Sequence, residues 1–257
     1  MDQRLEEHYA KLADIYNALW DGRPEYPDWM AERIRSRLKV QQGHRIADIG
    51  VGTGLFLRRL LPYATPDTPV LGIDPSAPLL ELFPDDRRLH PVQATAEDVV
   101  AQRVRLPYAS FDAILIKEAV HHFTDLDNTL TGLAHRLAPG GRFLIVALPP
   151  KIGYPLFQAA LDRFAVEQPD PEKIAVALRN AGLETTIEYE EFPATIDREV
   201  WIDLVSDRWM SVLSNFSDAE LARGIEEIRE RYTAPQLELL DRFVFILGHR
   251  PAEAPHA

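Results

Sequence analysis

The stretch RIADIGVGTGLFLRRLL, residues 45–61, constrains the fold more than any other part of the chain. An apolar run ends at Asp48, glycines follow at positions 50, 52 and 54, and apolar residues then resume with helical spacing. A strand that is joined to a helix by a glycine-rich turn forms a cleft of nucleotide size. Glycines adopt positive φ, and without side chains they let a ligand approach the main chain. A tight strand-to-helix connection without a ligand is the plainer alternative.

Strand and helix patterns alternate along the first 150 residues. Helical patterns occupy 53–61 and 125–141, and Gly140 and Gly141 are expected to end the second of them. Segments typical of strands lie at 44–50, 69–74, 89–94, 111–120 and 142–148. This alternation predicts an α/β fold with a mostly parallel, doubly wound sheet and helices on both faces.

The regular alternation of strand and helix patterns ends after Leu148. Helices are expected near 155–165 and 171–181, strands at 184–192 and 242–250, and a helical insertion at about 197–231. The last two strands are expected to pair antiparallel at the sheet edge, which gives seven strands in all. The predicted organisation is a helical lid at 1–40, a ligand-binding core at 41–150, the rest of the core with its helical cap at 151–250, and a flexible tail at 251–257.

Composition excludes several classes of function. The 257 residues carry a net charge of −12 and no basic stripe, which argues against nucleic acid or an anionic membrane as partner. There is no cysteine, and the histidines lack metal-ligand spacing, so no metal site is expected. The charged N-terminus has no apolar signal region, and no apolar run approaches the ~18 residues of a membrane span, so a cytoplasmic location is expected.

A second carboxylate supports a ligand-binding reading of the glycine turn. Asp74 ends the second predicted strand, 20 residues after Gly54, where it can accept hydrogen bonds from a ribose diol. A dinucleotide fits less well. Leu55 occupies the position at which the dinucleotide motif has a glycine, and the negative charge of Asp48 would lie close to a negatively charged pyrophosphate. The same Asp48 suits a cationic ligand that carries an amino group and a positive sulfur.

Five ordered motifs resemble a known family. The segments ADIGVGTG, LGIDPS, ATAEDV, FDAILIKEAVHHFTD and LAPGGRFLIV look like those of the class I S-adenosylmethionine-dependent methyltransferases. Among these, the chain is most similar to the small-molecule branch that includes the ubiquinone and menaquinone methyltransferases. The resemblance covers roughly residues 8–150 and implies a Rossmann-like fold with S-adenosylmethionine as cofactor.

The resemblance implies a role for each matching position. Asp48 and the backbone around the three glycines would hold the methionine moiety, and Lys117 would lie beneath it. Thr95 stands where family members often have an acidic residue, so Glu97 or Asp98 would bind the adenine amine instead. The implied cofactor-binding residues are Asp48, Gly50, Gly52, Thr53, Gly54, Asp74, Pro75, Ser76, Ala96, Glu97 and Lys117.

Two histidines are the candidate catalytic residues. His121 and His122 follow the fourth strand, where open α/β sheets place ligands, and an imidazole there could deprotonate a hydroxyl or an activated carbon. The alternative is that both are loop residues bonded to backbone. His122 is favoured slightly over His121.

The acceptor pocket is expected to draw on the lid, the cap and the loop after the fifth strand. Tyr9 and Tyr16 lie on one face of a predicted N-terminal helix, which in the family folds over the cofactor. Trp201 and Arg208 belong to the cap, and Tyr154 to the loop. An aromatic cap favours a hydrophobic acceptor, and an arginine could grip a carboxylate. Packing within the cap is the alternative reading.

The predicted function is methyl transfer from S-adenosylmethionine to oxygen or carbon, less readily to nitrogen, of a small hydrophobic or aromatic metabolite. The expected partner is that small-molecule acceptor, without nucleic acid or membrane, and the chain is expected to be a monomer or homodimer. Two alternatives stay open: an NAD(P)-dependent oxidoreductase and a non-catalytic module that binds S-adenosylmethionine.

Overall fold

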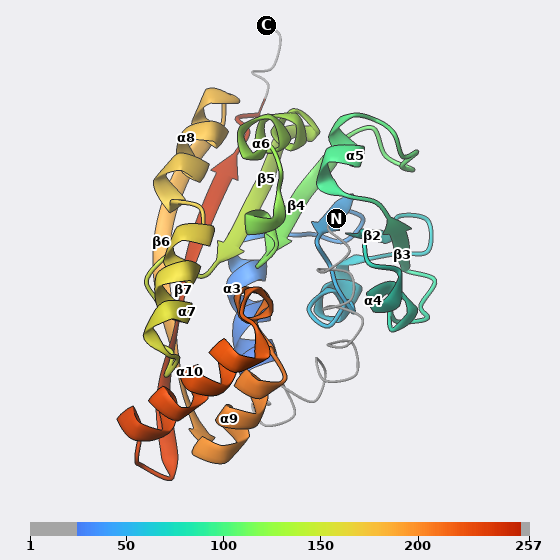
Figure 1. Cartoon of the computed structure of the whole chain (residues 1–257). Helices are drawn as coiled ribbons and strands as arrows, with labels where there is room; N and C mark the ends of the chain where they lie inside the picture. The colour runs from blue at the N-terminus through green and yellow to red at the C-terminus, as the bar shows by residue number, and fades with distance from the viewer. Residues whose placement is uncertain (1–24, 253–257) are drawn as a thin grey trace, which may run out of the picture.

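A seven-stranded sheet with strand order β3-β2-β1-β4-β5-β7-β6 organises the chain. The computed structural model describes residues 25–252 (Figure 1). The strands are β1 (Ile46–Ile49), β2 (Val70–Asp74), β3 (Leu89–Gln93), β4 (Phe111–Lys117), β5 (Leu137–Ala147), β6 (Glu184–Asp197) and β7 (Gln236–His249). All pairs among β1 to β5 are parallel, whereas β7 runs antiparallel to both β5 and β6. The predicted doubly wound sheet with an antiparallel last strand is therefore confirmed.

Helices cover both faces of this sheet, as the buried residues demonstrate. One face packs against α5, α6 and α8, and the other against α3 and η1. The α-helices are α3 (Glu25–Leu38), α4 (Ala77–Glu81), α5 (Ala96–Val100), α6 (Leu126–His135), α7 (Gln158–Glu167), α8 (Pro171–Asn180), α9 (Arg198–Ser206) and α10 (Asp218–Arg231). The 3₁₀ helices are η1 (Leu57–Tyr63), η2 (Val120–His122) and η3 (Ser211–Asn215).

The element after the glycine turn differs from its prediction. The sequence predicts a helix at 53–61, but the structure has the 3₁₀ helix η1, which begins at Leu57. Gly52 and Gly54 have φ of +57° and +76°, so the left-handed backbone of the turn delays the start of the helix. Pro62 lies inside η1 and has no amide hydrogen to donate, which disfavours α-helical pairing there.

The glycine pair near residue 140 also does not end a helix. Helix α6 stops at His135, and Gly140 and Gly141 lie within strand β5. Gly140 has φ of +77°, and a Cβ on Gly141 would approach the carbonyl oxygen of Ala138 to 2.8 Å. The register with β4 shifts between Phe111 and Ala113, so the glycines form an irregular start to the strand.

The last two strands are longer than predicted and carry the helical insertion. They pair from Glu184 opposite His249 to Asp197 opposite Gln236, well past the end of the pairing with β5 at Ala147. Helices α9 and α10 lie at the far end of this ribbon (Figure 1). With η3, α7 and the start of β7 they enclose a core of their own, which we call the cap core.

Capping residues fix where the cap helices begin. Asp197 accepts hydrogen bonds from the amides of Glu199 and Val200 at the start of α9. Ser217 and Glu220 form a reciprocal capping box at the start of α10. None of the helices described between residues 25 and 252 is long and apolar enough to cross a membrane.

Candidate active site

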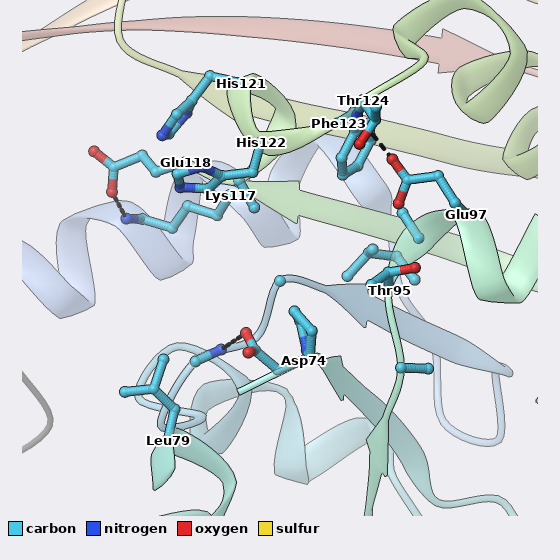
Figure 2. A pocket seen from close by; sticks show the side chains of 17 residues that line it. Asp74, Leu79, Thr95, Glu97, Lys117, Glu118, His121, His122, Phe123 and Thr124 are labelled. Atoms are coloured by element: carbon cyan, nitrogen blue, oxygen red, sulfur yellow. Dashed lines mark hydrogen bonds and ion pairs between the residues drawn. The ribbon is translucent and has the colours of Figure 1, made fainter. Parts of the chain in front are cut away.

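A cavity of about 490 Å³ opens where strands β1, β2 and β4 end (Figure 2). This is the edge at which open α/β sheets bind ligands. Its walls combine the glycine turn, the end of β2, the start of α5 and the segment after β4. The lining residues are Ile49, Gly50, Gly52, Asp74, Pro75, Leu79, Ala94, Thr95, Ala96, Glu97, Lys117, Glu118, Ala119, His121, His122, Phe123 and Thr124.

The glycine turn is held against its neighbours by close contacts. Gly50 has φ of +75°, and a Cβ there would come within 2.3 Å of the Cβ of Ala119. Its amide donates to the carbonyl oxygen of Ile73 at 2.7 Å. Gly54 faces Phe83 and Pro84 rather than the cavity. The first glycine therefore brings β1 and the segment after β4 together, and Gly52 presents bare backbone to the cavity.

Asp74 is fixed at the centre of the cavity wall. One carboxylate oxygen accepts from the Gly52 amide at 2.9 Å and the other from the Ser76 amide at 2.8 Å. Burial raises its pKa, and these two backbone hydrogen bonds oppose that rise. Each oxygen keeps a further lone pair, so the carboxylate is oriented and still able to accept hydrogen bonds from a diol.

Asp48 lies behind the glycine turn and does not line the cavity. It is only 3% exposed, and its Oδ1 has no hydrogen-bond partner within residues 25–252. Burial raises its pKa to about 7, against the nearby charge of Lys117 and helped by that of Asp74. Thr53 and Ser76 are buried in the same region, and the Ser76 hydroxyl also has no partner among the described residues.

The segment around Thr95 forms the opposite wall. The Thr95 hydroxyl and the Asp98 carboxylate make a capping box at the start of α5, and Arg103 binds Asp98 at 2.6 Å. These hydrogen bonds, that of Arg103 first, lower the pKa of Asp98. Glu97 instead lines the cavity, where its Oε1 accepts from the Thr124 amide at 2.9 Å. Of the two acidic residues considered for the adenine amine, Glu97 is thus the one at the cavity.

The histidine pair follows β4 and lies in η2. Both rings line the cavity, with centroids 3.9 Å apart and planes tilted by 49°. The His121 ring keeps some contact with solvent but is packed among protein atoms on most sides, and this burial lowers its pKa to about 4. His121 is therefore neutral near pH 7 and a weak base, so His122 is the better candidate to accept a proton.

The predicted acceptor residues of the cap lie apart from this cavity. Tyr154 and Trp201 are buried in the cap core, where the Trp201 indole donates to the carbonyl oxygen of Pro155 at 2.7 Å. Arg208 donates to Asp218 and to the carbonyl oxygen of Phe216. Tyr9 and Tyr16 lie outside the described residues.

Sequence reasoning missed part of the cavity wall. Glu118 lines the cavity and forms an ion pair with Lys117, and Phe123 and Thr124 complete the side nearest Glu97 (Figure 2). The signal was present, because these residues follow the same strand end that singled out Lys117 and the histidines. Within residues 25–252, no three histidine or carboxylate side chains are grouped so as to hold a metal ion.

Comparison with known proteins identifies the domain around this cavity. Residues 47–143 match a family model described as a methyltransferase domain. The chain is 32% identical to the methyltransferase GfsG of Streptomyces halstedii over 56% of this chain and 57% of that protein. It is 25% identical to the 27-O-demethylrifamycin SV methyltransferase of Amycolatopsis mediterranei, over 87% and 82% of the two chains.

A quinone-pathway relative supports the same family. The ubiquinone/menaquinone biosynthesis C-methyltransferase UbiE of Caulobacter vibrioides is 30% identical over 60% of this chain and 62% of its own length. In three of the first four curated relatives it matches, the chain spans only about half of the relative's length.

Solved structures share the fold across almost the whole chain. The 4+2-cyclase SpnF superimposes with a TM-score of 0.64 and 17% identity, covering 97% of this chain and 96% of that one. The YcgJ protein of Bacillus subtilis gives 0.60 and 18%, with 87% and 98% covered. Residues 47–143 thus form a methyltransferase domain of the kind that takes S-adenosylmethionine as cofactor.

Proposed function

We propose that this chain transfers the methyl group of S-adenosylmethionine to an oxygen or carbon atom of a small hydrophobic or aromatic metabolite. One observation carries the proposal: a cavity of about 490 Å³ that brings Gly50, Gly52 and Asp74 together at the carboxyl ends of the strands. The names of the curated relatives agree with it, since they include O-methyltransferases and C-methyltransferases of small molecules.

The residues present fit the cofactor. Asp74 would bind the ribose hydroxyls, because its carboxylate is held rigid by two backbone amides. Ala96, Glu97 and Pro75 would surround the adenine. Asp48, whose buried Oδ1 has no partner among the residues that the structure describes, would receive the amino group of the methionine part, and Lys117 would lie beside that part. Thr53, Gly54 and Ser76 would support these groups from behind the wall.

The chemistry requires little more than orientation from the protein. When bound, the cofactor supplies an activated methyl group together with its leaving group. The protein must hold the acceptor atom in line with that methyl and exclude competing water. An acceptor hydroxyl or acidic carbon must also lose a proton, and His122 at the cavity wall is the residue we assign as base.

The cap would shape the remainder of the acceptor site. Its core brings Tyr154, Trp201 and Trp209 within 6.0 Å of one another by ring centroid, and these packed rings hold the cap together rather than face the cavity. A carboxylate on the acceptor would have to replace Asp218, whose side chain is fully exposed, as the partner of Arg208. We therefore assign Arg208, with Tyr9 and Tyr16 as further candidates, to the part of the site that selects the acceptor, whereas Tyr154 and Trp201 support the cap from within its core.

A second function is considered because the same fold occurs in a protein described as a cyclase. This second candidate is a module that binds S-adenosylmethionine without transferring its methyl group. A dehydrogenase is disfavoured by charge, because the described residues that line the cavity include the carboxylates of Asp74, Glu97 and Glu118 and one ammonium, that of Lys117. A pyrophosphate would be repelled there.

Mass spectrometry tests the proposal. The protein is incubated with isotopically labelled S-adenosylmethionine and a metabolite extract, and small molecules that gain a labelled methyl are identified. We expect a new methyl ether or C-methyl product that is absent with Asp74→Ala protein. Tight cofactor binding without any labelled product across a broad acceptor screen would support the non-catalytic alternative.

A further inference from the structure

Glu118 stands at the end of β4 in an unusual backbone conformation. Its φ is +53°, in the left-handed region that non-glycine residues rarely adopt. The Glu118 amide donates to the carbonyl oxygen of Val146 at 2.7 Å, which holds this conformation in place. Non-glycine residues held in this conformation are often found at functional sites.

The left-handed backbone at Glu118 directs the side chains of Lys117 and Glu118 to the same side of the strand. Successive side chains of an extended strand point to opposite faces. Here Lys117 and Glu118 both line the cavity and form an ion pair (Figure 2). The left-handed turn thus places a carboxylate beside the ammonium group inside the site.

Lys117 brings a buried positive charge to this side of the cavity. Its side chain is only 6% exposed, and its ammonium lies 4.2 Å from the centre of the Phe56 ring. Its charge also acts on the buried carboxyl of Asp48. A cation in such surroundings repels any further positive charge brought into the cavity, because effective dielectric constants inside proteins are low.

The charge of the cavity matters because the cofactor changes charge during the reaction. S-adenosylmethionine carries an ammonium, a carboxylate and a sulfonium, a net charge of +1, whereas S-adenosylhomocysteine carries a neutral sulfur and a net charge of zero. In Figure 2 Lys117 and Glu118 lie on one side of Asp74, and Thr95 and Glu97 on the other. With the ribose at Asp74 and the adenine near Glu97, the sulfur belongs to the side of Lys117 and Glu118.

We propose that Glu118 is a specificity residue that neutralises Lys117 and so lets the cavity favour the sulfonium form of the cofactor over its neutral product. This inference rests on the proposed function, because it assumes that the cavity binds S-adenosylmethionine. The two ligands share every group except the methyl and its charge. The ratio of their dissociation constants therefore isolates the interaction with the sulfur.

Titration calorimetry of the two ligands tests this role. Glu118→Gln removes one negative charge from beside the ammonium of Lys117, so the preference for S-adenosylmethionine over S-adenosylhomocysteine should fall about tenfold. Lys117→Met leaves Glu118 without its counter-charge and should raise the same preference. The double variant should return to within about threefold of the wild-type ratio, even if both ligands bind more weakly.

Glu97→Gln is the matched control, since it removes the same charge at the other end of the cavity. It should change both dissociation constants together, and the ratio by less than about threefold. Melting temperatures of all variants show whether each is folded. A protein that binds neither ligand contradicts the proposed function. A protein that binds both, with a ratio that Glu118→Gln leaves unchanged, contradicts the role of Glu118 alone.

Discussion

Asp48 illustrates how a single residue trades stability for a binding role. Its carboxyl is buried, its Oδ1 has no partner among the described residues, and burial raises its pKa to about 7 from 3.8. An unfolded chain ionises this group at a much lower pH than the native protein does. The contribution of Asp48 to the free energy of unfolding therefore decreases as the pH rises from about 4 to about 7, and it changes no further above that range.

The substitution Asp48→Asn tests this account, because asparagine has no proton to lose. Without cofactor, the stability of the variant relative to the wild type should increase by on the order of 2 kcal/mol between about pH 5 and pH 8. At pH 8 the variant should also bind S-adenosylmethionine more weakly, since the amino group loses a charged partner. Thermal denaturation and calorimetry measure the two effects. Parallel pH profiles for variant and wild type would show that the carboxyl is not held protonated by burial.

The neighbouring histidines differ in what they can do. His121 has its pKa lowered to about 4 by burial, whereas His122 lines the same cavity in ring contact with it. His122→Ala should lower the rate of methyl transfer by about 10²-fold or more if it accepts the acceptor's proton. The affinity for S-adenosylmethionine should change little. Single-turnover rates and calorimetry separate the two quantities, and an unchanged rate would remove His122 from the mechanism.

At the scale of elements, a short helix positions one wall of the cavity. Helix α5 has five residues, too few to be stable alone, and its start is fixed by the capping box of Thr95 and Asp98. Glu97 lies in its first turn, where it also binds the Thr124 amide. The capping box at the start of α5 therefore determines the position of the cavity wall on the adenine side.

Thr95→Ala removes the N-terminal capping side chain of α5 and should lower the free energy of unfolding by about 1 kcal/mol. It should also weaken cofactor binding severalfold, because Glu97 loses its fixed position. Ser217→Ala removes the equivalent cap from α10 and is the control. It should cost similar stability and leave cofactor affinity unchanged. Chemical denaturation and calorimetry on both variants make the comparison, and equal losses of affinity would refute the special role of α5.

The elements that the sequence predicts well are those with strong local signals. Strand β4 has an apolar, fully buried centre at residues 113–116, and Ser217 and Glu220 form the capping box that begins α10. Positive φ at Gly52 and Gly54 is also a local property, but its effect of delaying η1 depends on the whole turn. The glycines at 140 and 141 resemble a helix end in sequence, and only pairing with β4 makes them part of a strand.

At the scale of the whole molecule, the site depends on contacts between distant segments. The rule that parallel strands bind ligands at their carboxyl ends places Gly50, Asp74 and His122 together without knowledge of side-chain packing. It does not predict that Lys117 and Glu118 point to the same side, since that requires the left-handed backbone at Glu118. Nor can composition reveal that Trp201 donates to Pro155 within the cap core rather than facing the cavity.

A crystal structure of the protein with S-adenosylmethionine is the most direct test of the central claim, that Asp74 and the glycine turn bind this cofactor. The account predicts the nucleoside in the cavity, its ribose hydroxyls within hydrogen-bond distance of the Asp74 carboxylate and its sulfur on the side of Lys117 and Glu118. A cavity that stays empty at saturating cofactor, or a ribose bound away from Asp74, would contradict it.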